Sequence, residues 1–201
     1  MDYLIVVNKS NLIDASFFNN LELVECVDVF GEIISVERET YKAYLKLKKF
    51  LKTKNIFIEL DSAYRSIEEQ QRIINDHTAE YGIDFVNKYV APVRASEHHT
   101  GLALDLALVD EERKSIENEG SFANENIYLE IHKYLSDFGF ILRYPKGKEN
   151  ITGYDYEPWH IRFVGIENAK NIANNNLTLE EYVIRYNKKD SRRRYLLQGR
   201  M

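Results

Sequence analysis

The feature that most constrains the fold is one run of alternating residues. From Leu102 to Leu108 every second residue is a leucine, and Ala103, Asp105 and Ala107 stand between them. A period of two is typical of a β-strand that packs one face into a hydrophobic core. The same period places Asp105 on the opposite face, between alanines that are too small to cover it. We therefore expect a strand that presents a reachable carboxylate.

A histidine stands close to the start of this strand. Gly101 suits a tight backbone approach or a positive φ, which lets the loop carrying His98 fold back over the strand end. His98 and Asp105 can then share an ion.

A second segment reads as a short strand that follows a proline. His160 and Arg162 share one face of it, and Pro158 marks an edge or entry position because it has no amide donor. By strict alternation Glu157 would point away from His160. We therefore expect a bend at Pro158.

These side chains match the needs of a catalytic zinc ion. Such an ion takes three nitrogen or oxygen ligands and a water whose pKa it lowers to about 7. His98, Asp105 and His160 offer two imidazoles and a carboxylate, and Glu157 is the candidate general base. However, a histidine near an apolar strand is usually a structural residue. Residue chemistry alone leaves a metal site and ordinary structural roles both open.

Longer motifs carry a family resemblance. The pattern Ser-x-His-x-x-Gly-x-Ala-x-Asp, followed by Glu-x-Trp-His, is found at Ser96, His98, Gly101, Ala103, Asp105, Glu157, Trp159 and His160. A Tyr-Arg-Ser-x-x-x-Gln segment over 64–70 precedes them, and a further segment that belongs to the pattern, over 139–154, leads to Glu157. In this order, over about residues 6–165, the motifs resemble the zinc D,D-peptidases. That family includes the D-alanyl-D-alanine carboxypeptidases and dipeptidases of vancomycin resistance.

The resemblance implies one Zn²⁺ held by His98, Asp105 and His160. Glu157 would activate the zinc-bound water for attack on the D-Ala-D-Ala bond of a dipeptide or of a peptidoglycan precursor. His99 lacks the matching spacing, so we expect it to lie behind the ligands or at the surface.

The resemblance also implies a substrate site. Arg65 and Gln70 would bind the peptide end or steady the oxyanion, and Tyr64 and Trp159 would lie beside the substrate. Ser96 would bind the substrate carboxylate. From the residues alone, Arg65 could instead form a surface ion pair, and Ser96 could brace the loop of His98.

The sequence alone leaves other activities open. The chain could be an L,D-carboxypeptidase or a lysin-type endopeptidase of peptidoglycan peptides. A non-catalytic zinc-binding module is a further alternative, although a structural site needs neither an open position nor a base.

We expect an α+β fold with helices packed on a small, mainly antiparallel sheet and the metal in a cleft on that sheet. The length of 201 residues and the 44% hydrophobic content fit one domain over 1–201, with a core over about 3–186 and a basic tail. The expected strands lie at 3–7, 56–60, 102–108, 140–144 and around 160, and the expected helices at 39–54, 66–80, 126–138 and 178–186. Residues 8–25 should be irregular, 145–156 a polar loop, and 109–124 an exposed excursion that could cap the site.

Composition narrows the partners. A net charge of −5 argues against a general nucleic-acid binder and favours a small peptide substrate. No apolar run approaches the roughly 20 residues of a membrane helix. The single cysteine fits a reducing compartment. We expect a cytoplasmic protein unless an N-terminal anchor precedes this chain.

Overall fold

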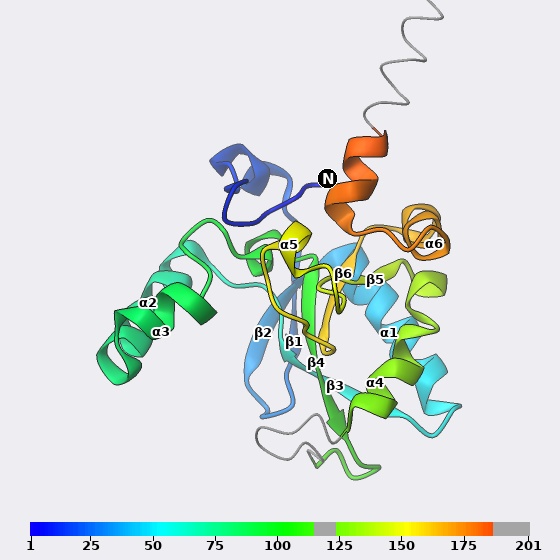
Figure 1. The fold of residues 1–201 in the computed structure, drawn as a ribbon. Helices are drawn as coiled ribbons and strands as arrows, with labels where there is room; N and C mark the ends of the chain where they lie inside the picture. The colour runs from blue at the N-terminus through cyan, green and yellow to red at the C-terminus, as the bar shows by residue number, and fades with distance from the viewer. Residues whose placement is uncertain (115–123, 187–201) are drawn as a thin grey trace, which may run out of the picture.

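The computed structural model describes residues 1–114 and 124–186, without the side chains of residues 87–89. Its centre is a four-stranded sheet in the order β3-β4-β6-β5, in which every neighbouring pair is antiparallel (Figure 1). These strands are β3 (Phe57–Ser62), β4 (Ala103–Val109), β5 (Phe140–Leu142) and β6 (His160–Phe163). Two further strands, β1 (Leu23–Val27) and β2 (Ile33–Glu37), pair in a separate hairpin.

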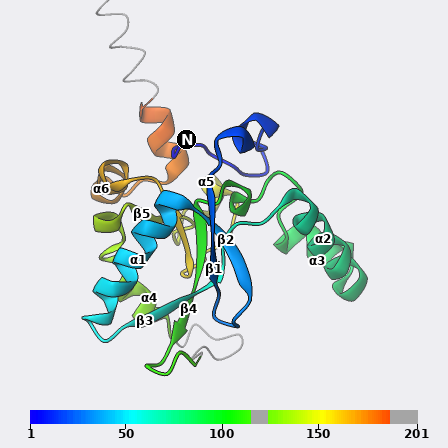
Figure 2. The same ribbon diagram turned by 180° about the vertical axis from the view of Figure 1, so that it is seen from behind.

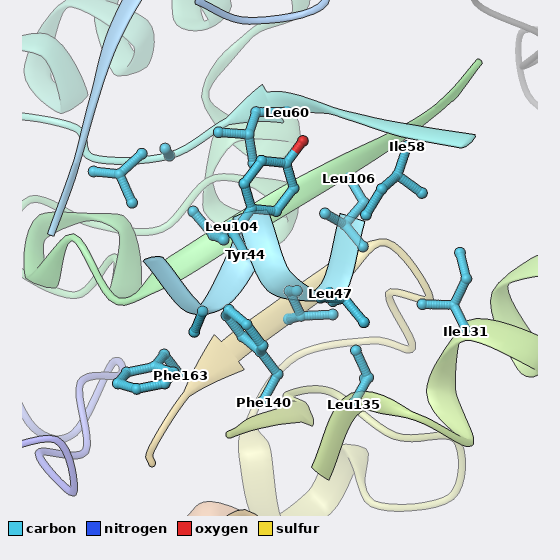
Figure 3. Close-up of a cluster of buried hydrophobic side chains, with 14 of the residues drawn as sticks. Tyr44, Leu47, Ile58, Leu60, Leu104, Leu106, Ile131, Leu135, Phe140 and Phe163 are labelled. Carbon is cyan, nitrogen blue, oxygen red and sulfur yellow. The ribbon is translucent and has the colours of Figure 1, made fainter. Parts of the chain in front are cut away.

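The leucines of β4 point into the main hydrophobic core, as their alternation predicts. Leu104 is fully buried in the cluster that α1 (Arg38–Lys52) forms with the sheet, to which the helix contributes Tyr44 and Leu47 (Figure 3). Full burial of one such aliphatic side chain stabilises the fold by about 1.5–3 kcal/mol. This core occupies one face of the sheet, and Asp105 lies on the other.

Two short helical segments extend the core where one helix over 126–138 is expected. They are α4 (Glu125–His132) and η4 (Leu135–Phe138), and the second is a 3-10 turn. Gly139 ends η4 at φ +85°, and a Cβ at this position would lie 2.7 Å from the Phe163 ring. A glycine is therefore needed for the chain to turn into β5.

Two helices form an arm beside the sheet. The arm consists of α2 (Ile67–Tyr81) and α3 (Ile83–Tyr89), which are joined at Gly82. Ser66 caps α2, because the Glu69 amide donates to Ser66 Oγ at 3.0 Å. The arm projects on the side opposite α1 and α4 (Figures 1 and 2).

The C-terminal region forms a second, smaller core. Helix α6 (Ile166–Asn174) packs there with Leu179, which begins the helix over 179–186. A capping box begins this helix: the Thr178 amide donates to Glu181 Oε2 at 2.8 Å, and the Glu181 amide donates to Thr178 Oγ1 at 3.2 Å. N-terminal residues also pack on this cluster, beside the last helix (Figure 2).

The α+β class is confirmed, but several predicted elements are wrong. Residues 3–7 are not a strand, and part of the region expected to be irregular forms η1 (Ala15–Asn20) and β1. Leu45 of α1 is 45% exposed although it is apolar, because it lies one residue round the helix from buried Tyr44. The expected polar loop over 145–156 contains α5 (Glu149–Thr152).

Two sequence predictions fall mainly outside the described residues. The excursion that could cap the site includes residues 115–123, and the basic run over 188–194 lies in the C-terminal tail. Within 1–114 and 124–186, no helix is both long enough and apolar enough to cross a membrane.

Candidate metal centre and active site

Strand pairing brings Asp105 and His160 together. They are direct partners in the antiparallel β4–β6 pair, so both side chains leave the sheet on the same face. Asp105 Oδ1 lies 2.9 Å from His160 Nδ1. Nevertheless, Oδ1 is buried and has no hydrogen-bond partner among the described residues. The two atoms approach without the alignment of a hydrogen bond, as two ligands of one cation do.

The turn before β4 supplies His98. This residue lies in η2 (Glu97–Thr100), and Gly101 at φ +67° turns the chain from η2 into the strand. His98 Nδ1 lies 2.6 Å from the Ala63 carbonyl, which fixes the proton on Nδ1. His98 Nε2 is thereby left to face Asp105 Oδ2 at 3.2 Å. A β-bulge between Leu60 and Ser62 lies just before the Ala63 carbonyl, at the strand end nearest Asp105.

Glu157 reaches the same place through the expected bend. Pro158 and Trp159 form a turn in which the His160 amide donates to the Glu157 carbonyl at 3.2 Å. The turn brings Glu157 Oε2 to 3.6 Å from His160 Nδ1. His132 Nε2 braces the turn by donating to the Pro158 carbonyl at 2.8 Å.

The site shifts the pKa of its members in opposite directions. Burial raises the pKa of Glu157 to about 7, and the nearby Asp105 carboxylate adds to this effect while His160 opposes it. Burial also opposes the charging of His160, but Asp105 outweighs it and raises the pKa of His160 to about 10. The two histidines likewise overcome the burial of Asp105 and hold its pKa well below the usual range. Glu157 therefore has the character of a proton acceptor that works near neutral pH.

Three of these side chains fit a metal ion. One ligand atom from each of His98, Asp105 and His160 lies within 4.8 Å of the other two. Two imidazole nitrogens and a carboxylate oxygen are a ligand set of catalytic zinc, and the unpartnered Asp105 Oδ1 is available to it. Because the ligands bind in deprotonated form, a cation would displace the proton on Nδ1 of His160.

Arg65 is held beside the ligand segment by its own backbone. Its amide donates to the His98 carbonyl at 3.2 Å, and His99 Nδ1 lies 2.7 Å from its carbonyl. The guanidinium donates to Gln70 Oε1 at 3.1 Å and to Ser62 Oγ at 3.3 Å. Gln70 is fully buried and also donates to the Ala91 carbonyl at 2.7 Å. These contacts favour a role for Gln70 in orienting Arg65 over the expected direct contact with substrate.

The other expected substrate residues are close in the chain to the ligands or to Arg65. Ser96 is buried at the start of η2, and Tyr64 is half-buried next to Arg65. Trp159 is 39% exposed directly before His160. His99 is fully buried, so the expected surface position is wrong; its ring lies between the Arg65 carbonyl, at 2.7 Å, and the Arg94 amide, at 3.3 Å. Direct contacts of these residues with substrate stay predictions.

Sequence reasoning missed a group of buried charges behind the site. Glu97 and both arginines that it contacts, Arg143 and Arg162, are buried almost completely. Glu97 Oε1 accepts from Arg143 Nε and from Arg162 Nη1, each at 2.6 Å. The only sequence signal was the face that Arg162 shares with His160, because nothing local pairs these three residues.

Comparisons with known proteins fit this geometry. A family profile described as "VanY: D-alanyl-D-alanine carboxypeptidase" matches residues 33–166. The chain belongs to the VanY family. The D-alanyl-D-alanine carboxypeptidase of Enterococcus faecalis is 34% identical over 193 residues, which are 90% of this chain. The bifunctional D-Ala-D-Ala dipeptidase and carboxypeptidase VanXYC of Enterococcus gallinarum is 36% identical over 127 residues, 62% of this chain. This chain spans 65% of the length of each of these two relatives.

Solved structures show the same VanY-family fold. A VanY D,D-pentapeptidase variant in complex with Zn(II) has a TM-score of 0.74 and 33% identity, covering 91% of this chain and 99% of that one. VanYB in complex with D-alanine-D-alanine has a TM-score of 0.73 and 32% identity, covering 90% and 97%. The LdcB L,D-carboxypeptidase has a TM-score of 0.73 and 35% identity, covering 90% and 85%.

Proposed function

We propose that this protein is a zinc-dependent D,D-peptidase that cleaves the D-Ala-D-Ala bond of the dipeptide, of peptidoglycan precursor ends, or of both. The observation that carries the proposal is the convergence of His98, Asp105, His160 and Glu157 on one face of the β4–β6 pair. VanY-family membership supports it, as do the relatives whose structures hold Zn(II) and D-alanine-D-alanine.

His98, Asp105 and His160 would hold one Zn²⁺. When bound, the ion would polarise the scissile carbonyl and make a water molecule more acidic. Glu157 Oε would accept a proton from the attacking water, a role that its pKa of about 7 suits. The same carboxyl group would then give that proton to the departing amine nitrogen as the C–N bond breaks.

Arg65 would stabilise the negative charge that develops on the carbonyl oxygen. Its guanidinium is oriented by Gln70 and Ser62, so little reorganisation is needed when that charge forms. Tyr64, Ser96 and Trp159 would contact the peptide from positions around the ligands. A small peptide that ends in D-Ala-D-Ala is the partner that this site would take.

The test is D-alanine release from D-Ala-D-Ala and from a precursor pentapeptide by the zinc-loaded protein. We expect release that a chelator abolishes and that Glu157→Gln lowers at least 100-fold while zinc stays bound. Glu167→Gln, which neutralises an exposed carboxylate of α6, is the matched control and should retain activity. A Glu157→Gln enzyme with near-normal turnover would refute the base assignment.

A tetrapeptide in the same assay separates the main alternative. The LdcB L,D-carboxypeptidase is about as similar to this chain as VanYB is, which makes an L,D-peptidase the main alternative. Such an enzyme would release D-alanine from the tetrapeptide alone. A cross-linked peptide would detect the lysin-type endopeptidase. Zinc binding without cleavage of any of these substrates would point to the non-catalytic module. A single domain over 1–201 and a cytoplasmic location stay predictions.

A further inference from the structure

His160 has a second ring nitrogen that the proposed zinc site does not use. This atom, Nε2, is buried and has no hydrogen-bond partner among the described residues. The carboxylate oxygen Oε2 of Glu97 lies 3.6 Å away, just beyond hydrogen-bond length. Oε2 is also buried without a partner in the described parts of the chain. A donor and an acceptor therefore face each other, and a small adjustment would pair them.

The tautomer of His160 explains why this contact matters. A neutral imidazole carries one proton, so a ring that binds a metal through Nδ1 must keep its proton on Nε2. His160 Nδ1 is the nitrogen that faces Asp105, at 2.9 Å. His98 has the opposite tautomer: its Nδ1 proton is held by the Ala63 carbonyl, and its Nε2 is left for the metal. Glu97 occupies, for His160, the place that the Ala63 carbonyl occupies for His98.

The charges around Glu97 leave Oε2 available for this task. Both arginine contacts are made to Oε1, by Arg143 and Arg162. Arg143 is clamped at its other end by Glu180, through bonds of 3.0 and 2.6 Å. Arg162 Nη2 donates to the carbonyls of Tyr3 and Ile5, at 3.2 and 2.8 Å, and its Nε donates to the Phe163 carbonyl at 3.2 Å. Two carboxylates and two guanidiniums balance, so Glu97 stays ionised although it is buried.

We propose that Glu97 is a positioning residue that holds the Nε2 proton of His160 and keeps Nδ1 directed at the metal. This inference rests on the zinc site proposed above. Carboxylates that hold the far nitrogen of a metal-bound histidine fix its ring and raise its basicity, and their loss costs about 10- to 100-fold in metal affinity.

The groups that hold Arg143 and Arg162 from the other side lie outside the part of the chain that matches the family profile. Glu180 belongs to the helix over 179–186, and the Tyr3 and Ile5 carbonyls belong to the N-terminal segment, whereas the match covers 33–166. The two ends of the described chain thus support the buried side of a metal ligand, on the same face of the sheet as the ligands themselves.

The experiment compares zinc affinity in two variants, by competition with a chromophoric chelator. Glu97→Gln removes the charged acceptor of His160, and Glu180→Gln removes a carboxylate from the same Arg143 without touching His160. We expect the zinc dissociation constant to rise at least 10-fold in Glu97→Gln and to stay within threefold of wild type in Glu180→Gln. ¹⁵N NMR of the His160 ring should show a protonated, slowly exchanging Nε2 in wild type and faster exchange in Glu97→Gln.

Two double variants keep the test valid if Glu97→Gln does not fold. Glu97→Gln/Arg143→Gln and Glu180→Gln/Arg143→Gln each remove one positive and one negative charge, so both leave a neutral network. The first should bind zinc at least 10-fold more weakly than the second, and equal affinities would overturn the role of Glu97. Failure of the wild-type protein to bind zinc would instead refute the proposed function.

Discussion

Gly101 is where we expect one added methyl group to disturb the site most. It joins η2, which carries His98, to β4, which carries Asp105, and it adopts a left-handed conformation with φ +67° and ψ 2°. A Cβ built here would lie 3.2 Å from both the amide nitrogen and the Cβ of Glu37, which caps α1. Gly101→Ala therefore combines backbone strain with a steric contact.

Three terms enter the estimate of the loss of stability. A left-handed conformation costs an alanine roughly 1–2 kcal/mol, and the lower entropy of the unfolded alanine chain returns about 0.4–1 kcal/mol. Overpacking adds roughly 1–3 kcal/mol. We thus expect Gly101→Ala to lower the free energy of unfolding by about 3 kcal/mol, within a range of about 1–5 kcal/mol. Gly153 is the matched control, since its φ of +78° and ψ of 10° are similar and a Cβ there would meet nothing within 4 Å.

Urea unfolding of the metal-free proteins, followed by fluorescence, measures the change in the free energy of unfolding in Gly101→Ala and in Gly153→Ala. Metal-free protein is used because zinc binding would add its own stabilisation. Gly153→Ala should cost about 1 kcal/mol or less, with an unchanged dependence on urea. If the two variants lost the same stability within about 0.5 kcal/mol, the close approach of Gly101 to Glu37 would have no energetic weight. Gly101→Ala should also weaken zinc binding, because the displaced segment carries His98.

Three further predictions concern binding, pH and substrate. Zinc at about 1,000 times its dissociation constant should raise the free energy of unfolding by about 4 kcal/mol, and urea titration of His98→Ala should show no such gain. Burial lowers the pKa of His132 from its ordinary value of 6.5, so the unfolded chain binds the proton more readily. The free energy of unfolding should therefore fall as the pH drops below about 6.5, and unfolding at pH 7.5 and 5.5 should show a shallower fall in His132→Gln. An equal slope in both proteins would contradict that account. Arg65→Lys keeps the charge but loses the planar fork, so kcat/KM for the dipeptide should fall roughly 100-fold with zinc affinity unchanged.

Local sequence patterns predicted the features of this protein that depend on one strand, one turn or one helix alone. The leucine alternation of β4 predicted both the core face and the position of Asp105. The bend at Pro158 was predictable because a regular strand would have turned Glu157 away from His160. The caps of Ser66 and Thr178 were predictable because they depend on residues three positions apart.

Long-range contacts account for what the sequence left undetermined. Glu97 and Arg162 are far apart along the chain, and no local pattern indicates that the two charges pair in the interior. Residues 3–7 have the composition of a strand, but the carbonyls of Tyr3 and Ile5 accept hydrogen bonds from the Arg162 side chain instead of from a neighbouring strand. The burial of Gln70 depends on the Ala91 carbonyl, which a reading of α2 alone cannot place.

The direct pairing of Asp105 with His160 also bears on how this protein can be re-engineered. The distance between these two candidate ligands is set by the spacing of neighbouring strands, which is about 4.8 Å in any sheet. The arm formed by α2 and α3, in contrast, packs mainly on itself and stands apart from the sheet (Figure 1). An exchange of the arm between relatives would therefore leave the ligand spacing unchanged, provided that the new arm keeps Gln70, which orients Arg65.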